Sequence, residues 1–337
     1  MSAIVGRTEL RARKIDSGRP ATSLPDQPLL VGVLLLTHLL LLIIELQQVH
    51  GHVVVILNDA RRYHQIATTH GLAYRDFPVE IPPLGLIAIK LLNAPDVPGT
   101  AIRLACFSFA MQLVVTFGLW KGWGLRAAYG YLVLTLPLAL FLFFRIDLLA
   151  IALAVGGITL ALRGKERTGG LLLAAAVLAK GWPLLLMVVL LIKHKTIAAR
   201  WFAVATILAV GVWVAVGGIE APIQVLTFRH AQGWQIYSTP GILTILLTGA
   251  NPTMDAGSSR VGAATQWELG LLALALLAYA VAIWYRLRRA TNPPEWAPAT
   301  GMLAALLFLA PIVSEQYVGW LMPWVAMAGA QGKAGIE

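Results

Sequence analysis

The fold is decided by the run PLLVGVLLLTHLLLLIIEL, from Pro28 to Leu46, which holds one histidine and one glutamate among apolar or small residues. A helix needs about 20 apolar residues to cross a hydrocarbon core about 30 Å thick. Trp267 to Tyr285 is nearly as apolar, and the 337-residue chain is 58% apolar but only 12% charged. Soluble domains carry about 25% charged residues. Since helices satisfy their own backbone in lipid, the sequence predicts an all-α, polytopic transmembrane bundle.

The basic first 27 residues resemble the charged start of a signal peptide. The apolar run after them is too long for one, and no small-residue cleavage site follows. We therefore expect 1–27 to be a cytoplasmic tail and the run to remain as the first span. The single cysteine, Cys106, excludes a disulfide framework within one chain. The net charge of +10 fits the Lys and Arg of cytoplasmic loops, so no nucleic-acid partner is expected.

Charge counting predicts the topology. With the N-terminus inside, about ten spans fit in a membrane domain at 28–331, and a C-terminal tail at 332–337 is also cytoplasmic. The expected outer segments are 49–99, with juxtamembrane helices, and 219–266, whose apolar stretch 240–249 is a surface or re-entrant helix. Of the 26 Lys and Arg, 17 then lie inside and nine outside, in line with the positive-inside rule, and nine of the 16 acids lie outside.

The block 169–192 has basic clusters beyond both of its ends. Both clusters can be cytoplasmic only if the block turns back in its middle. The sequence Lys180-Gly-Trp-Pro183 lies there, and Gly and Pro break helices. We therefore predict two short arms that meet near Lys180 at the outer side.

Under this topology the informative polar residues share the outer side. Asp59 follows the first span closely and is placed to act as a general base; the alternative is an Asp that caps a helix beginning at Ala60. Lys90, Arg145 and Lys180 are isolated cations on the side where cations are less frequent, which favours an anionic ligand such as a polyprenyl phosphate. The alternatives are snorkelling to the interface and pairing of one cation with Asp147.

Other patterns are weaker or absent. The segment from Arg229-His230 to Gln235-Ile-Tyr237-Ser238 contacts sugar in one interpretation and forms an amphipathic surface helix in the other; both stay open. The seven histidines show no metal-ligand spacing, so no metal is predicted. The chain lacks a P-loop, a GxGxxG and a Gly-x-Ser-x-Gly motif. No cofactor is expected, and an activated sugar would have to come from a lipid carrier.

The ordered motifs resemble a known family. The run Asp59, Tyr63, GLAYRDF (71–77) and EIPPL (80–84) is similar to the first outer loop of GT-C glycosyltransferases, particularly glycosyltransferase family 87, which typically reads Asp, Tyr, then PYRDF and EYPPL. Further similar motifs follow in the family's order: Arg145-Ile-Asp147, LAKGWPLLL (178–186), His230 with QIYS (235–238), and SEQY (314–317). The chain departs from the family's pattern at Ile81, Tyr237 and Glu315, which stand where the family has Tyr, Glu and Pro.

The resemblance implies a multi-pass enzyme of the plasma (inner) membrane. It would move a sugar, often mannose, from a polyprenyl-phosphate-sugar to a lipid or glycan acceptor at the outer face, inverting the anomeric carbon. It implies that Asp59 is the base and that Lys90, Arg145 and Lys180 lie near the carrier phosphate, whose charge cations stabilise. The substrate-binding residues expected on this basis are Tyr63, Asp76, Glu80, Asp147, His230, Gln235, Gln316 and Tyr317.

Two rival functions remain open at this point. A transporter or flippase of a lipid-linked sugar would use the same cations, but the chain has no convincing internal repeat of the kind that transporters show. A non-catalytic membrane assembly protein would explain the departures from the motifs. In all three cases the partners include membrane lipids.

Overall fold

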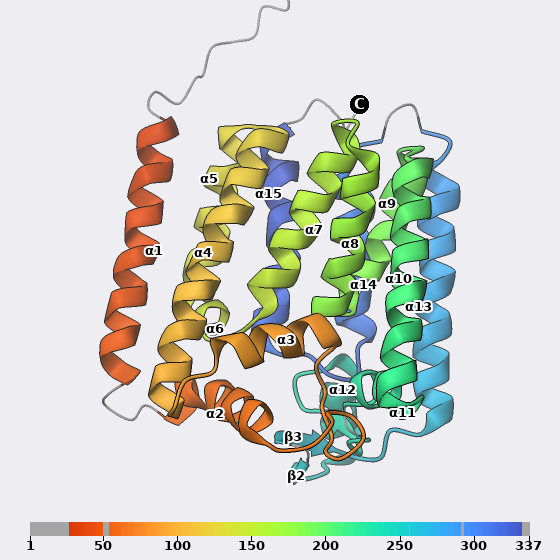
Figure 1. Cartoon of the computed structure of the whole chain (residues 1–337). Helices are drawn as coiled ribbons and strands as arrows, with labels where there is room; N and C mark the ends of the chain where they lie inside the picture. The colour runs from red at the N-terminus through yellow and green to blue at the C-terminus, as the bar shows by residue number, and fades with distance from the viewer. Residues whose placement is uncertain (1–26, 50–53, 229, 256, 291–292, 332–337) are drawn as a thin grey trace, which may run out of the picture.

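The computed structural model describes residues 27–49, 54–228, 230–255, 257–290 and 293–331. The expected tails at 1–27 and 332–337 lie outside these residues, Gln27 excepted. The chain forms a helical bundle in which the axes of the long helices run in nearly the same direction (Figure 1). Five helical segments are long and apolar enough to cross a membrane, which indicates a multi-pass membrane protein. They are α1 (Gln27–Val49), α4 (Val97–Trp123), α5 (Leu125–Thr135) continued through η1 (Leu136–Leu138) and α6 (Ala139–Phe143), α10 (Thr196–Gly217), and α13 (Gln266–Leu287).

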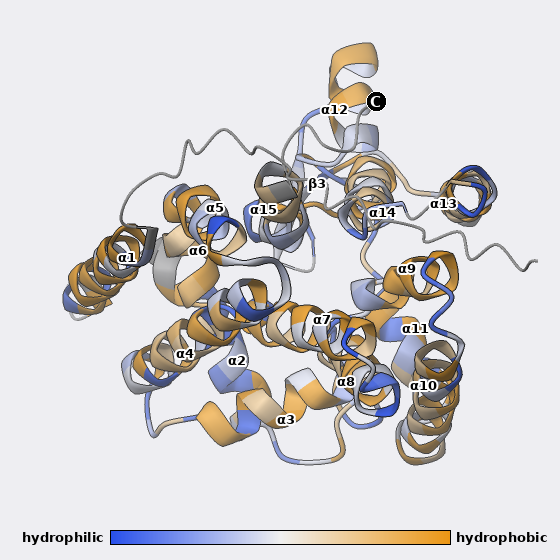
Figure 2. Ribbon diagram, turned by 90° about the horizontal axis from the view of Figure 1, so that it is seen from above, coloured by the Kyte–Doolittle hydropathy of each residue, from blue (hydrophilic) through white to orange (hydrophobic). Residues whose placement is uncertain are grey.

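The long helices at the rim of the bundle expose apolar side chains. Seen from above, α1 lies at one edge of the bundle and α10 and α13 lie at the opposite edge, and hydrophobic residues predominate along them (Figure 2). The spanning part of α13 buries none of its residues inside the protein, and Ile207 of α10 is 69% exposed. A helix that is apolar all round needs an apolar surrounding. These surfaces therefore suit lipid.

Shorter helices fill the centre. They are α7 (Asp147–Leu162), α8 (Glu166–Ala179), η2 (Trp182–Leu186), α9 (Met187–Ile192), α14 (Trp296–Leu309) and α15 (Met322–Gln331). Glycines let these backbones approach closely, as small residues do in membrane bundles. A Cβ added at Gly157 would lie 3.0 Å from the carbonyl oxygen of Gly169, and one at Gly170 would collide with the carbonyl oxygen of Ala198. Helix α8 is therefore tightly held between α7 and α10.

The predicted reversal at Lys180 is confirmed. Helix α8 ends at Ala179, the chain turns at Lys180-Gly181, and η2 and α9 run back (Figure 1). Lys195, just after α9, forms an ion pair with Glu166 at the start of α8, with Nζ and Oε1 3.6 Å apart. Both ends of the hairpin thus lie at the same end of the bundle.

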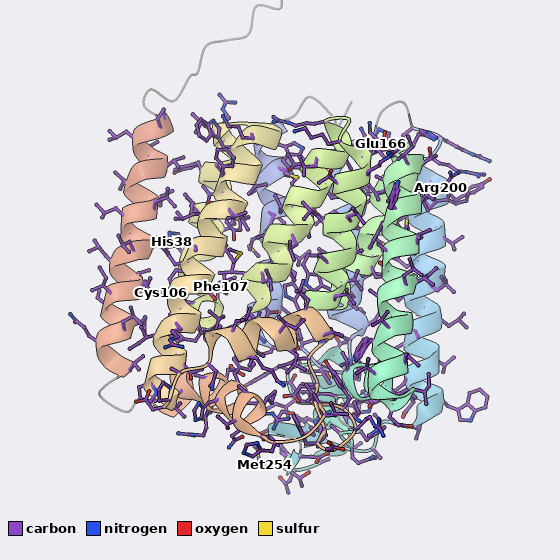
Figure 3. The ribbon with its side chains drawn as sticks, viewed as in Figure 1. His38, Cys106, Phe107, Glu166, Arg200 and Met254 are labelled. Atoms are coloured by element: carbon purple, nitrogen blue, oxygen red, sulfur yellow. The ribbon has the colours of Figure 1, made fainter. Side chains whose placement is uncertain are left out.

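The loops separate into two ends. At one end lie the α7–α8 and α9–α10 connections, with Glu166 and Arg200, together with the start of α1 and the end of α15 (Figures 1 and 3); we call it the basic end. The opposite end, called here the α2–α3 end, carries Met254 (Figure 3) and α2 (Val54–Thr68), α3 (Pro83–Leu92), η3 (Glu315–Trp320), α11 (Glu220–Leu226) and α12 (Thr239–Thr248). The two segments expected outside, 49–99 and 219–266, therefore share one end over their described residues.

Two alternatives that the sequence left open are excluded. Helix α2 begins at Val54, so Asp59 lies within it and does not cap a helix beginning at Ala60. The segment after His230 is not a surface helix, because it contains strand β1 (Trp234–Gln235). Its neighbours are β2 (Thr253–Asp255) and β3 (Ser258–Val261), in the antiparallel order β1-β3-β2. Helix α12 starts only after Ser238, whose hydroxyl accepts from Gly241 N.

Candidate active site

Asp59 and Tyr63 lie one turn apart on the same face of α2. Tyr63 is buried in the cluster that α2 forms with the following loop and α3, whereas the Asp59 side chain remains 32% exposed. The Asp59 carboxylate forms an ion pair with Arg145, with 2.6 Å between Oδ2 and Nη2. Helix α2 thus delivers a carboxylate that both protein and solvent can reach.

Arg145 occupies the turn between α6 and α7. Its backbone carbonyl accepts a hydrogen bond of 2.7 Å from Oγ of Ser108 on α4. Its guanidinium reaches Asp59 through Nη2 and Ser314 through Nη1, which lies 3.4 Å from Oγ. The side chain therefore bridges α2 and the segment before η3.

Asp147, the first residue of α7, is fully buried and has two partners. Nζ of Lys180 lies 3.3 Å from both of its carboxylate oxygens, and the indole Nε1 of Trp320 donates to Oδ1 at 2.9 Å. A buried carboxylate needs such compensation. Asp147 therefore fixes Lys180, which stands at the tip of the reversed hairpin.

Aromatic rings from η3 and the hydroxyl of the residue just before it complete the cluster. The Tyr317 ring stacks on Trp320 with centroids 4.1 Å apart, and Nζ of Lys180 lies 5.4 Å from the centre of the Tyr317 ring. Ser314 Oγ donates to Oε1 of the buried Gln316 at 2.6 Å. The aromatic faces and the two cations thus belong to one site.

The loop between α2 and α3 is held at several points. Glu80 accepts from Arg62 through both carboxylate oxygens, at 3.1 and 2.9 Å. Gln224 of α11 accepts from the Val79 backbone N–H at 3.1 Å and donates to the carbonyl of Tyr74 at 2.8 Å. These bonds tie the loop to α2 and α11.

The electrostatics of α2 follow from burial and from nearby cations. Burial raises the pKa of Asp59 above its ordinary value, while Arg145 and then Lys180 oppose the rise. Burial, followed by the Asp59 charge, raises the pKa of Tyr63 well above that of a free phenol. Tyr63 therefore stays a neutral hydroxyl beside the carboxylate.

Most of the residues predicted from the sequence come together here. Asp59, Tyr63, Arg145, Asp147, Lys180, Gln316 and Tyr317 form the cluster, and Glu80 acts on Asp59 and Tyr63 through its charge. Gln235 contacts the segment that precedes Ser314. Its backbone N–H donates to Pro311 O, and its side-chain oxygen accepts from Val313 N. It therefore supports the loop that presents Ser314.

Three of the predicted residues are not gathered into this cluster. Lys90 is exposed on α3, whose buried face carries Gly85, Leu86 and Ile89. Asp76 is exposed and accepts from the Leu72 backbone N–H within its own turn. His230 is exposed, and its Nε2 lies 3.5 Å from Glu220.

The expectation of isolated cations needs a correction, since Arg145 and Lys180 both have carboxylate partners. From the sequence, Asp147 could pair with either cation. In the structure it pairs with Lys180, and Arg145 pairs with Asp59. Trp320, Ser314 and Ser108 were missed. Local sequence carries no signal for Trp320: it shares a face with Tyr317, three residues earlier, only because the segment forms the 3₁₀-helix η3.

The cluster therefore combines a partly exposed carboxylate with two cations near a stacked aromatic pair. No group of three His, Cys, Asp or Glu suited to a metal occurs among the described residues. Comparison of the chain with protein families, curated proteins and solved structures finds no match.

Proposed function

We propose that the chain is a membrane glycosyltransferase. It takes a sugar, with mannose as the first to test, from a polyprenyl-phosphate-linked donor and transfers it to a hydroxyl of a lipid or glycan acceptor. In this proposal the bundle is a GT-C-like domain of about ten spans with both ends cytoplasmic. The α2–α3 end faces the outside of the plasma membrane.

The observation that carries the proposal is the meeting of Asp59, Arg145 and Lys180, which come from three distant parts of the chain. A carboxylate is the group needed to deprotonate a hydroxyl, and cations are needed where a phosphate leaves. The cluster lies at the end away from the basic loops, which the positive-inside rule assigns to the outer side. Sugars reach that side on lipid carriers, in line with the lack of nucleotide-binding motifs.

The proposed reaction is a direct displacement. The acceptor hydroxyl transfers its proton to Asp59 while its oxygen attacks the anomeric carbon. The bond from that carbon to the phosphate oxygen breaks, and its electron pair stays on polyprenyl phosphate. Arg145 and Lys180 stabilise the charge that develops on this leaving group. One displacement from the opposite side inverts the anomeric configuration.

The test is a transfer assay on membranes with radiolabelled polyprenyl-phosphate-mannose. Asp59→Asn keeps the size of the side chain but removes its basicity, so transfer should fall by about 100-fold or more, the usual contribution of a general base. Asp96→Asn is the control: Asp96 caps α4 at the same end by accepting from Gly99 N at 2.7 Å, and Asn caps equally well. Its activity should match that of the unmodified protein.

The outcomes separate the rival functions. Transfer that is lost in Asp59→Asn and kept in Asp96→Asn supports the enzyme. Movement of the labelled lipid between leaflets without transfer would instead indicate a flippase, and neither activity would indicate an assembly protein. An Asp59→Asn protein with full transfer activity would contradict the assignment of the base.

A further inference from the structure

The backbone of Arg145 is held in place, whereas its side chain has two partners within reach. Its carbonyl is held by Ser108, so the residue itself stays in place. Its guanidinium is shared between Asp59, at 2.6 Å, and the neutral hydroxyl of Ser314, at 3.4 Å. The head of a long side chain can swing between such partners without movement of a helix.

Lys180 is held differently. Its partner Asp147 has a side chain only 1% exposed, and Trp320 binds the same carboxylate. Removing Lys180 would leave a charge buried without its cation, which is strongly unfavourable. Asp59 is 32% exposed, so water can replace Arg145 there at a smaller cost. Of the two cations, Arg145 is therefore the one that can leave its carboxylate.

The cluster is also balanced in charge. Arg145 and Asp59 form one pair, and Lys180 and Asp147 form the other. An arriving phosphate group therefore has to take its cation from one of these pairs. An arginine fork binds phosphate in the same two-point geometry in which it binds a carboxylate.

We propose that Arg145 exchanges Asp59 for the donor's phosphate, so that the base is released only after the donor has bound. Binding is then ordered, with the polyprenyl-phosphate-sugar before the hydroxyl acceptor. This inference rests on the proposed glycosyltransferase function and adds a positioning role for Arg145 before the chemical step. In the donor-free site, Arg145 binds Oδ2 of Asp59, so the carboxylate is paired with a cation and is a weaker proton acceptor.

The exchange also strengthens the base. Arg145 is the first of the two cations that oppose the effect of burial on Asp59. When it moves to the phosphate, the pKa of Asp59 rises further, and the carboxylate becomes a better proton acceptor. The same movement brings Arg145 beside the leaving group.

The exchange can be detected without turnover by labelling with a hydrophobic carbodiimide, which reacts with protonated carboxyl groups. The full-length protein in lipid nanodiscs is treated with and without sugar-free polyprenyl phosphate, and the modified Asp59 peptide is measured by mass spectrometry. The carrier should accelerate labelling of Asp59, by about tenfold for each unit of pKa rise where the carboxyl is mostly ionised. Glu80, paired with Arg62 at 2.9 Å at the same end, is the internal control and should not change.

Two variants sharpen the test. Arg145→Gln should label rapidly at Asp59 without the carrier and show no further increase with it. Ser314→Ala keeps the ion pair and should retain the carrier-dependent increase.

Binding of radiolabelled polyprenyl phosphate is measured on the same samples. Carrier that binds but leaves Asp59 labelling unchanged, or slows it, overturns the exchange while the proposed function stands. A protein that binds no carrier overturns the proposed function and the exchange together. Equal acceleration at Glu80 also overturns the exchange, because it would report a general loosening of this end.

Discussion

The two carboxylates of the cluster differ in surroundings, and this difference divides their tasks. Asp147 is sealed from solvent and bound by Lys180 and Trp320, so it serves as a fixed counter-ion. Asp59 is partly exposed, and among the residues that the structure describes Arg145 is the one cation within ion-pair distance of it. Carboxylates in contrasting environments commonly take different roles in one site, and of these two only Asp59 can be reached from solvent.

The pKa of Asp59 predicts the pH dependence of transfer. Burial raises this pKa, and the base acts only as the carboxylate. Activity should therefore be lost as pH falls, with an acid limb above the ordinary Asp value of about 3.9. The measurement is kcat/KM for the acceptor against pH in detergent, with protein integrity followed by size-exclusion chromatography. An acid limb at or below that value would mean that burial does not govern this group.

Trp320 offers a second residue-scale prediction. Trp320→Phe keeps an aromatic ring for Tyr317 but removes the N–H donated to Asp147. A hydrogen bond to a charged group contributes about 1.5–3 kcal/mol, so the variant loses a bond that orients the Asp147 carboxylate toward Lys180, and the Lys180 ammonium is less precisely positioned. We expect KM for the donor to rise about tenfold or more while KM for the acceptor changes little. A variant that alters both constants equally would instead point to a general packing defect.

Sequence spacing alone could not assign these pairs. Arg145 and Asp147 are two residues apart, which suggests that they pair with each other. The turn between α6 and α7 sends them to different partners, because Asp147 starts α7 while Arg145 stays outside the helix. Such choices depend on which helix ends meet, and local sequence does not specify that.

At the scale of elements, the hairpin at Lys180 was predictable because charge and backbone chemistry agreed. Basic residues beyond both ends demanded a reversal, and Gly181 and Pro183 marked its position. Strand β1 was missed because two residues carry no periodic pattern. Its partner β3 is supplied by another part of the chain, which pairs Gln235 with Arg260.

Gly85 tests how closely the elements around the site must pack. A Cβ there would lie 2.8 Å from the carbonyl oxygen of Ala179 and 3.0 Å from Cδ1 of Ile146. These two residues directly precede Lys180 and Asp147. Gly85→Ala should therefore cost about 1–3 kcal/mol through overpacking and also reduce transfer, because the displaced residues carry the cluster.

The matched control is Gly211→Ala on α10, where an added Cβ meets nothing within 4 Å. Alanine in a helix interior is favoured over glycine by up to about 1 kcal/mol, so this variant should keep its thermal stability and activity. Stability is read as the apparent Tm in detergent for both variants. If Gly85→Ala has the same apparent Tm as the unmodified protein, α3 can shift more easily than its close approach to α8 implies.

For the whole molecule, the separation of charge between the two ends predicts which end of the bundle faces which side of the membrane. The ion pairs of Lys193 and Lys195 gather at the basic end, while Asp59 lies at the α2–α3 end. This separation of charge could be predicted from the sequence, because alternate loops of a transmembrane bundle lie on the same side of the membrane. It could not predict that the shorter helices sit at the centre, since that follows from contacts among all of them.

This arrangement predicts which loops a membrane-impermeant thiol reagent can reach. In a Cys106→Ser background, Arg75→Cys places one thiol on the exposed loop at the α2–α3 end, and Lys165→Cys places one at the basic end. Intact cells or spheroplasts should be labelled at position 75 and not at 165, and permeabilised membranes at both. The positive-inside bias is the physical reason, since it sets the orientation during insertion. Labelling of position 165 alone in intact cells would put Asp59 on the cytoplasmic side, where nucleotide sugars are the available donors, and the lipid-linked donor would lose its main support.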